Sequence, residues 1–204
     1  MIKNELAVPP VANGLNGFAK LQAKFRGDHS RRVHCTRAAK ACSFVCPFIA
    51  SSKEVAELIV SAANISPGDC IIDLGCGDGA LLLAAVESVK QRDILDVALR
   101  GYDIDSVRVA AAKRRLLAFG DMVRIEEKDI IDLDISDATI IFTFLVPSCM
   151  KALQAKFENC SLKSGLRVIC YKFPMTVWTP DREWEVEDVV KQGAKAKVFL
   201  YQIN

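Results

Sequence analysis

The sequence lacks any stretch of eighteen consecutive apolar residues, so we expect no transmembrane segment. It also lacks a charge imbalance, because 27 basic residues face 25 acidic ones and the net charge is only +2. A balanced charge gives no support for a nucleic acid partner. About half of the 204 residues are apolar, which predicts one domain with a sizeable core and a short extension, acting as a monomer.

The eight cysteines lack the regular spacing of a disulfide framework, and no secretory signal precedes them. Reduced intracellular thiols are the better interpretation. One cluster, His34-Cys35 with Cys42 and Cys46, has residue types that bind zinc. It has no Cys-x-x-Cys pair and no second matching half, so we predict no metal site.

Residues 1–45 are basic and poor in acids, with only Glu5 and Asp28 facing eight lysines and arginines. This composition is typical of a mitochondrial targeting segment. Glu5 and the Pro9-Pro10 pair count against a presequence helix, and a solvated basic arm fits equally well. We predict a basic N-terminal extension over 1–45 and a folded domain over 46–204, with a mitochondrial location and the cytoplasm as the alternative.

The chain is organised around an apolar run, Cys70–Leu74, that breaks into three alternating glycines and continues into the helix-forming stretch Ala80–Ala85. Strand, glycine turn and helix form the local geometry of a nucleotide-binding crevice in an open α/β sheet. Glycines suit such a turn because they accept positive φ and let the backbone approach a ligand.

The spacing of the turn distinguishes between cofactors. A dinucleotide fingerprint has the form G-x-G-x-x-G, whereas this turn has the form G-x-G-x-G and carries two carboxylates. Carboxylates would repel a pyrophosphate but suit the ammonium and hydroxyl groups of S-adenosyl-L-methionine. The turn resembles motif I of class I methyltransferases, which implies a cofactor site formed by Asp73, Gly75, Cys76, Gly77, Asp78 and Gly79.

Strands and helices alternate around this turn. A helix reaching about Ala63 is expected before it, with Ser51 and Glu54 as a capping box and Val55, Leu58, Ile59 and Ala62 as its apolar face. Helices are then expected over about 80–90, over 105–119 with Gly120 as its cap, and over 149–159 with Ser148 as its cap. The expected strands cover residues 98–103, 123–127, 137–144, 166–171, 184–190 and 197–203.

This order predicts the α/β class: a seven-stranded, mostly parallel Rossmann-like methyltransferase sheet with helices on both faces and an antiparallel C-terminal strand pair. Asp103 closes the second strand, where a carboxylate can accept both ribose hydroxyls of the cofactor. Asp129 follows the third strand, and the class I resemblance implies that it meets the adenine amino group. A surface aspartate is the alternative for Asp129.

Several further stretches together resemble one family. They are Pro47–Ala50, Val146-Pro147-Ser148, Arg167–Cys170, Phe173-Pro174, Trp178-Thr179-Pro180 and Lys197–Tyr201. The set is similar to the mitochondrial protein-lysine methyltransferases that modify ATP synthase subunit c and the adenine nucleotide translocase, over residues 45–202. The chain departs from that family at Ala80, Asp103 and Asp105-Ser106, and residues 1–45 contain no hydrophobic anchor.

The resemblance implies an S-adenosyl-L-methionine-dependent protein-lysine N-methyltransferase with a mitochondrial membrane protein as its substrate. Phe144, Pro147, Phe173 and Trp178 are then candidates for an apolar channel that desolvates the lysine, and core packing is the alternative for each. A small-molecule or RNA methyltransferase, or a catalytically silent cofactor-binding scaffold, remains an alternative. No Asn/Asp-Pro-Pro-Tyr/Phe motif is present to indicate adenine N-methylation.

Overall fold

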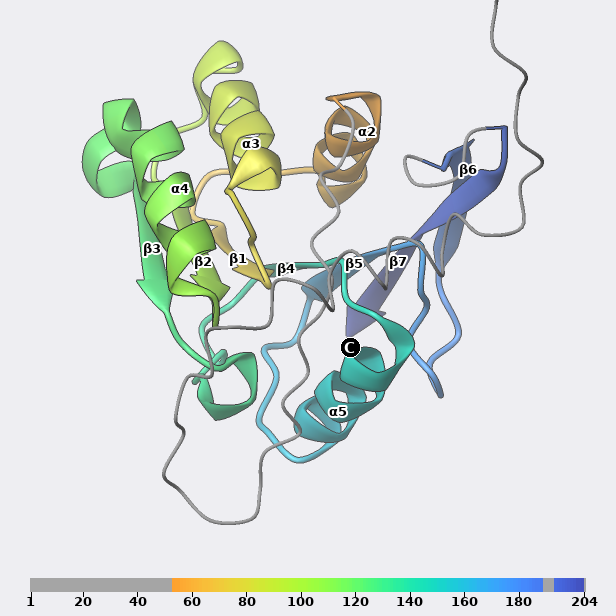
Figure 1. Ribbon diagram of the computed structural model, residues 1–204. Coiled ribbons are helices and arrows are strands. Elements are labelled where there is room, and N and C mark those ends of the chain that lie inside the picture. The colour runs from red at the N-terminus through yellow and green to blue at the C-terminus, as the bar shows by residue number, and fades with distance from the viewer. Residues whose placement is uncertain (1–52, 189–192, 204) are drawn as a thin grey trace, which may run out of the picture. The chain divides into compact units, whose positions relative to one another are not determined.

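The computed structural model describes residues 53–188 and 193–203, drawn in colour in Figure 1. The predicted N-terminal extension, the His34–Cys46 cluster, the Pro47–Ala50 stretch and the Ser51 cap all lie outside these residues. They therefore stay predictions.

The described residues are built on a seven-stranded sheet with the order β3-β2-β1-β4-β5-β7-β6. Strands β1 to β5 are parallel to one another, and β7 is antiparallel to both β5 and β6. This topology confirms the predicted fold class. The strand bounds are β1 Cys70–Leu74, β2 Ala98–Asp103, β3 Val123–Glu127, β4 Ile140–Thr143, β5 Leu166–Tyr171, β6 Arg182–Glu187 and β7 Lys195–Ile203.

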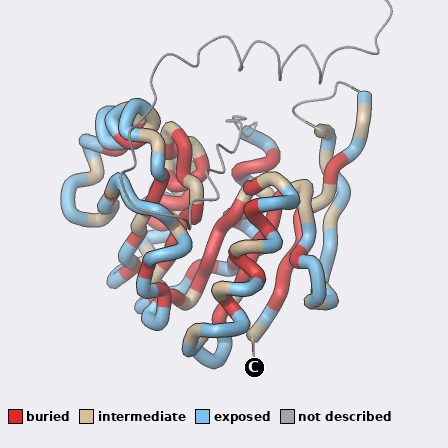
Figure 2. Tube along the Cα trace, turned by 60° about the horizontal axis from the view of Figure 1, so that its bottom comes forward, coloured by how far each residue is buried: buried red, intermediate tan, exposed pale blue. Residues whose placement is uncertain are grey.

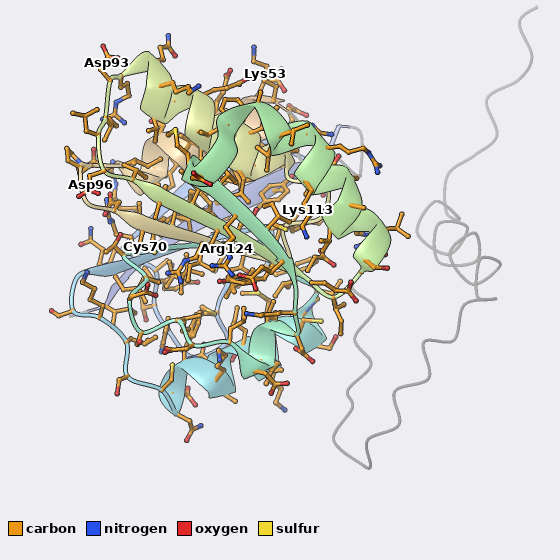
Figure 3. All side chains as sticks on the ribbon, turned by 90° about the vertical axis from the view of Figure 1, so that its left-hand side faces the viewer. Lys53, Cys70, Asp93, Asp96, Lys113 and Arg124 are labelled. Carbon is orange, nitrogen blue, oxygen red and sulfur yellow. The ribbon has the colours of Figure 1, made fainter. Side chains whose placement is uncertain are left out.

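Helices cover both faces of the sheet (Figure 1). On one face lie α2 (Lys53–Ala63), α3 (Ala80–Gln91) and α4 (Ser106–Leu116), and on the other lies α5 (Pro147–Glu158). Two 3₁₀ helices, η1 (Leu117–Met122) and η2 (Ile130–Asp132), flank β3. Figure 3 shows α4 lying along β2 and β3.

The core consists of two layers that sandwich the sheet. Neighbouring residues of a strand alternate between them, so Ile71 packs under α2 and α3 while Ile72 packs on the α5 side. The central strand β4 is buried on both faces, which explains its continuous apolar sequence. In Figure 2 the buried residues follow the strands and the inner faces of the helices.

Three local predictions are wrong. Helix α5 begins at Pro147 with Val146 as its N-cap and no side-chain cap, because a proline at the first position has no N–H to satisfy, so Ser148 is not the cap. Helix α4 ends at Leu116, and Gly120 lies in the following 3₁₀ segment. Helix α2 buries Ala56, Val60 and Ala63 in place of Leu58 and Ala62, which are only partly buried.

Gly101, in the middle of β2, provides a direct test of this packing. A Cβ atom built there would lie 2.6 Å from Cδ1 of Leu82, 2.7 Å from Cδ1 of Ile125 and 2.9 Å from Sγ of Cys76. A Cβ atom fits between α3, β3 and the glycine turn only if these side chains move. We expect Gly101→Ala to lower the free energy of unfolding by about 1–3 kcal/mol in urea denaturation. A change within about 0.5 kcal/mol would contradict this packing.

Candidate cofactor site

The glycine turn lies between β1 and α3, as predicted. Gly75, Gly77 and Gly79 have φ angles of 83°, 55° and 79°, in the left-handed region that favours glycine. The backbone N–H groups of Gly75 and Cys76 both donate to the carbonyl oxygen of Tyr102, at 2.8 and 3.0 Å. These two hydrogen bonds hold the turn against the carboxyl end of β2.

Gly79 is also where α4 approaches the turn. A Cβ atom there would lie 2.9 Å from Cδ1 of Leu116 and 3.1 Å from Cβ of Ala112. The absence of a side chain therefore lets α4 pack directly on the turn. Helix α4 begins just after Asp103 at the end of β2, and the turn follows the end of β1. The contact between α4 and Gly79 therefore holds the ends of β1 and β2, which form the predicted cofactor site, next to each other.

Asp103 is buried at the end of β2, with its carboxylate held by backbone N–H groups. One oxygen accepts from Gly77 and the other from Asp105, both at 2.9 Å. Each oxygen keeps a further lone pair for a ligand hydroxyl. The role of Asp103 as a ribose acceptor stays a prediction, and these free lone pairs are what it requires.

Asp73 is buried at the end of β1, opposite Gly101 of β2. Within residues 53–188 and 193–203, no hydrogen bond or ion pair to its carboxyl is found. Burial, followed by the nearby charge of Asp103, raises the pKa of Asp73 to about 8. Such a group gains from a cationic ligand, because a positive charge would favour its ionised form.

Asp78 has a different environment from Asp73. Nη2 of Arg115, from α4, lies 2.5 Å from one oxygen of Asp78, and the backbone N–H of Ala80 donates to the other at 3.3 Å. The negative charge of Asp78 is thus balanced within the protein, and the residue fixes the start of α3. The role of Arg115 is not visible in the sequence, because Arg115 lies in a run of basic residues, Lys113-Arg114-Arg115, that is typical of a solvated helix face.

Cys76 is buried and belongs to the core layer of α2, α3 and α4. Burial, and then the charges of Asp73 and Asp103, raise the pKa of the Cys76 thiol well above its usual range. The Cys76 thiol is therefore a neutral packing group, and Cys76 contributes to the turn through its backbone.

Asp129 follows β3 and is exposed. Its Oδ1 accepts from the backbone N–H of Ile131 at 3.0 Å and caps η2. Two exposed apolar side chains accompany it at this edge of the sheet, Ile104 at 61% and Ile131 at 41% exposure. Ile104 is an apolar residue directly after the strand-closing Asp103, and this sequence signal indicates a surface for a flat apolar group that the sequence analysis did not include.

The four candidate channel residues do not all come together. Phe144 and Pro147 follow β4, and Phe173 follows β5, so all three come after the carboxyl ends of their strands. Phe144 packs against the core layer of α2 and α3, whereas Phe173 packs against the α5 layer. Phe144 contacts Tyr171 edge to face, with ring centroids 4.6 Å apart. Trp178 instead stacks on Phe157 of α5, with centroids 5.6 Å apart, in the core layer on the other side from Phe144.

The residues present fit S-adenosyl-L-methionine. The buried carboxyl of Asp73, which has no partner in the described part of the chain, suits an α-ammonium. Asp103 suits two hydroxyls, and a glycine turn flanked by acids suits a ligand without phosphate. No group of three potential metal ligands is found in the part of the chain that the structure describes.

Residues 73–182 match the family described as the ANTKMT methyltransferase domain. The chain belongs to this family. It is an S-adenosyl-L-methionine-dependent methyltransferase, and a crystal structure of an RNA methyltransferase from Salinibacter ruber in complex with S-adenosyl-L-homocysteine has the same fold. That structure aligns with a TM-score of 0.64 and 27% identity, over 76% of this chain and 94% of its own.

Two relatives have names that state a substrate. A protein-lysine N-methyltransferase of Saccharolobus islandicus is 28% identical over 78% of this chain and 94% of its own length. The adenine nucleotide translocase lysine N-methyltransferase of Mus musculus is 27% identical over 68% of this chain. The match spans only 61% of the length of this mouse relative. Among the described residues, no helix is long and apolar enough to cross a membrane.

Arg115 is expected to position the glycine turn, because its guanidinium holds Asp78 against α4. We expect Arg115→Ala to weaken binding of S-adenosyl-L-homocysteine by about three- to tenfold, as a partly exposed ion pair contributes about 1 kcal/mol. Isothermal titration calorimetry measures this. The neighbouring exposed Arg114→Ala is the control. Equal affinity of the two variants would contradict the positioning role.

The raised pKa of Asp73 predicts a pH dependence of stability. The carboxyl titrates near 3.8 when unfolded and at about 8 when folded, so the ligand-free folded state binds the extra proton between these values. The free energy of unfolding should therefore fall as pH rises from 4 to 8, by up to about 1.4 kcal/mol per pH unit from this group. Asp73→Asn should lack this contribution. Urea denaturation of both proteins at pH 5 and 7 measures it, and parallel slopes would contradict it.

Proposed function

We propose that the protein is a protein-lysine N-methyltransferase. The observation that supports the cofactor assignment is the buried carboxyl of Asp73, which has no partner among the described residues and lies beside Asp103 at the glycine turn. Support for lysine as the acceptor comes from the relatives, since both the archaeal and the mouse proteins are lysine N-methyltransferases by name.

The proposed roles follow from where the side chains lie. When bound, the cofactor supplies a methyl group on a positively charged sulfur. Asp103 holds its ribose hydroxyls, Asp73 faces its ammonium, and Asp129 with Ile104 lies beside its adenine. The backbone of the turn from Gly75 to Gly79 supplies the space for it, with Asp78 fixing the turn from within.

The acceptor amine must reach the methyl carbon uncharged, from the side opposite the sulfur, so that the N–C bond forms as the C–S bond breaks and the thioether leaves. Phe144 and Pro147, after β4, and Phe173, after β5, are the proposed apolar residues that exclude water there, with Phe144 and Phe173 reaching the site from different core layers. Desolvation lowers the pKa of a lysine side chain, so the substrate's ammonium group loses its proton to water more readily when it lies against these apolar residues. Trp178 supports these residues indirectly, by fixing α5 through Phe157.

As the substrate we propose a mitochondrial membrane protein such as the adenine nucleotide translocase or ATP synthase subunit c. Two things support this: the names of the mammalian relatives and the basic composition of residues 1–45. The archaeal relative shows that lysine methylation in such proteins is not tied to mitochondria, so a cytoplasmic substrate is the alternative.

RNA is a second candidate acceptor, favoured by the similarity to the Salinibacter ruber RNA methyltransferase. The experiment that separates the two uses purified protein with S-adenosyl-L-methionine labelled in its methyl group. One sample receives a mitochondrial membrane extract, and a second receives total RNA.

We expect label in protein, on a lysine identified by mass spectrometry, and none in RNA. Asp103→Ala should lower the labelling at least a hundredfold, because it removes a buried ribose acceptor that also holds the turn. Asp121→Ala, an exposed carboxyl on η1, should leave the rate within twofold. Labelled RNA would overturn the lysine assignment, and labelling that survives Asp103→Ala would overturn the cofactor site.

A further inference from the structure

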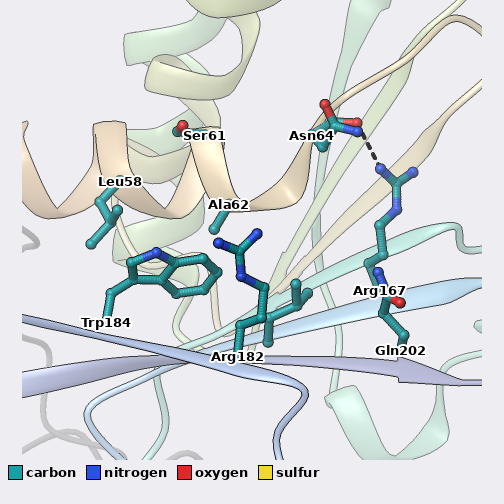
Figure 4. A pocket seen from close by; sticks show the side chains of 9 residues that line it. Leu58, Ser61, Ala62, Asn64, Arg167, Arg182, Trp184 and Gln202 are labelled. Atoms are coloured by element: carbon teal, nitrogen blue, oxygen red, sulfur yellow. Dashed lines mark hydrogen bonds between the residues drawn. The ribbon is translucent and has the colours of Figure 1, made fainter.

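A cavity of about 430 Å³ lies away from the cofactor site, between the C-terminal half of α2 and the strands β6 and β7 (Figure 4). Its volume falls within the range of small-molecule sites. Strands β4, β5 and β7 separate β6 from β1, which places the two strands about 19 Å apart across the sheet. None of the cofactor-site residues lines this cavity.

Among the described residues, two guanidinium groups line the cavity and no carboxylate does. Arg167 is already neutralised and fixed: its Nη1 donates to the carbonyl oxygens of Ala63 and Asn64, and its Nη2 lies 2.6 Å from Oδ1 of Asp69. It therefore forms a rigid polar wall that closes the C-terminal end of α2. Asn64 and Arg167 are joined in this way in Figure 4.

Arg182 is the cation without a counter-charge. Within the described residues it forms no ion pair, although acids flank it in the chain. Asp181 accepts from the backbone N–H of Gln202 at 2.7 Å, and Glu183 points to the opposite face of β6, where it pairs with Lys197 at 2.6 Å. The charge of Arg182 is therefore left facing the cavity.

Trp184 provides a flat apolar surface next to this charge. It lies two residues along β6, on the same face, and the guanidinium carbon of Arg182 lies 5.2 Å from its ring centroid. Leu58 and Ala62 of α2 and Leu200 of β7 add apolar walls, while Ser61 and Gln202 offer hydrogen bonds. Stacking on an aromatic ring pre-orients the guanidinium and leaves its donors free.

We propose that this cavity binds a small molecule that carries a carboxylate or phosphate group on a flat, apolar body. The acid group pairs with Arg182, and the flat body lies against Trp184 and Leu58. The Ser61 hydroxyl and the Gln202 side chain complete the polar contacts. This site is independent of the methyl acceptor, so the proposal stands or falls separately from the proposed function.

Isothermal titration calorimetry of the full chain, saturated with S-adenosyl-L-homocysteine to occupy the cofactor site, tests the proposal. The probes are phenyl phosphate and benzoate, which separate a phosphate from a carboxylate ligand. Benzyl alcohol supplies the ring alone, and inorganic phosphate supplies the charge alone. We expect at least one aromatic anion to bind at least tenfold more tightly than either of these single-feature probes.

Arg182→Gln should weaken that binding at least tenfold, and Arg182→Lys should recover only part of it, because lysine keeps the charge and loses the planar stack. Arg114→Gln, an exposed arginine on α4, should leave the affinity within twofold. Thermal unfolding of each variant checks that the fold is retained.

Three outcomes would overturn the proposal. One is that neither aromatic anion binds at millimolar concentration. Another is that Arg182→Gln and Arg114→Gln weaken binding equally, which would indicate non-specific charge attraction. The third is that inorganic phosphate binds as tightly as either aromatic anion, which would show that the flat body makes no contact with Trp184.

Discussion

The structure depends on two carboxyl groups, Asp73 and Asp103, buried side by side at the ends of neighbouring parallel strands. Burying like charges is unfavourable, and the protein satisfies only one of the two. Asp103 accepts two backbone N–H groups, whereas Asp73 has none among the described residues and holds its proton up to about pH 8. The ligand-free site therefore favours binding of a positively charged group, which would stabilise the ionised form of Asp73.

The surrounding elements keep these two groups in place. The carbonyl of Tyr102 accepts from both Gly75 and Cys76, so the glycine turn cannot move away from β2. Helix α4 packs on the bare backbone of Gly79 and sends Arg115 to Asp78. The turn is therefore rigid before any ligand arrives, which reduces the entropy that binding must overcome.

Much of this was predictable from the sequence. The bounds of β2, β3 and β5 were predicted to the residue, because apolar alternation and flanking turn residues mark them. The glycine turn and the positions of Asp73 and Asp103 followed from local spacing. The pairing of Arg115 with Asp78 did not, because the two residues are 37 positions apart and their contact depends on how α4 packs. The stacking of Trp178 on Phe157 could not be predicted from the sequence either, because it also depends on how α5 packs.

The preference of Asp73 for a cation can be measured as proton release. Binding of S-adenosyl-L-homocysteine at pH 7 is followed by calorimetry in buffers of different ionisation enthalpy. If the ammonium of the ligand ionises Asp73, close to one proton leaves the protein per ligand bound, and Asp73→Asn abolishes the release. Binding with no proton released, or with the same release in the variant, would contradict the assignment of Asp73 as the group that recognises the cofactor's charge.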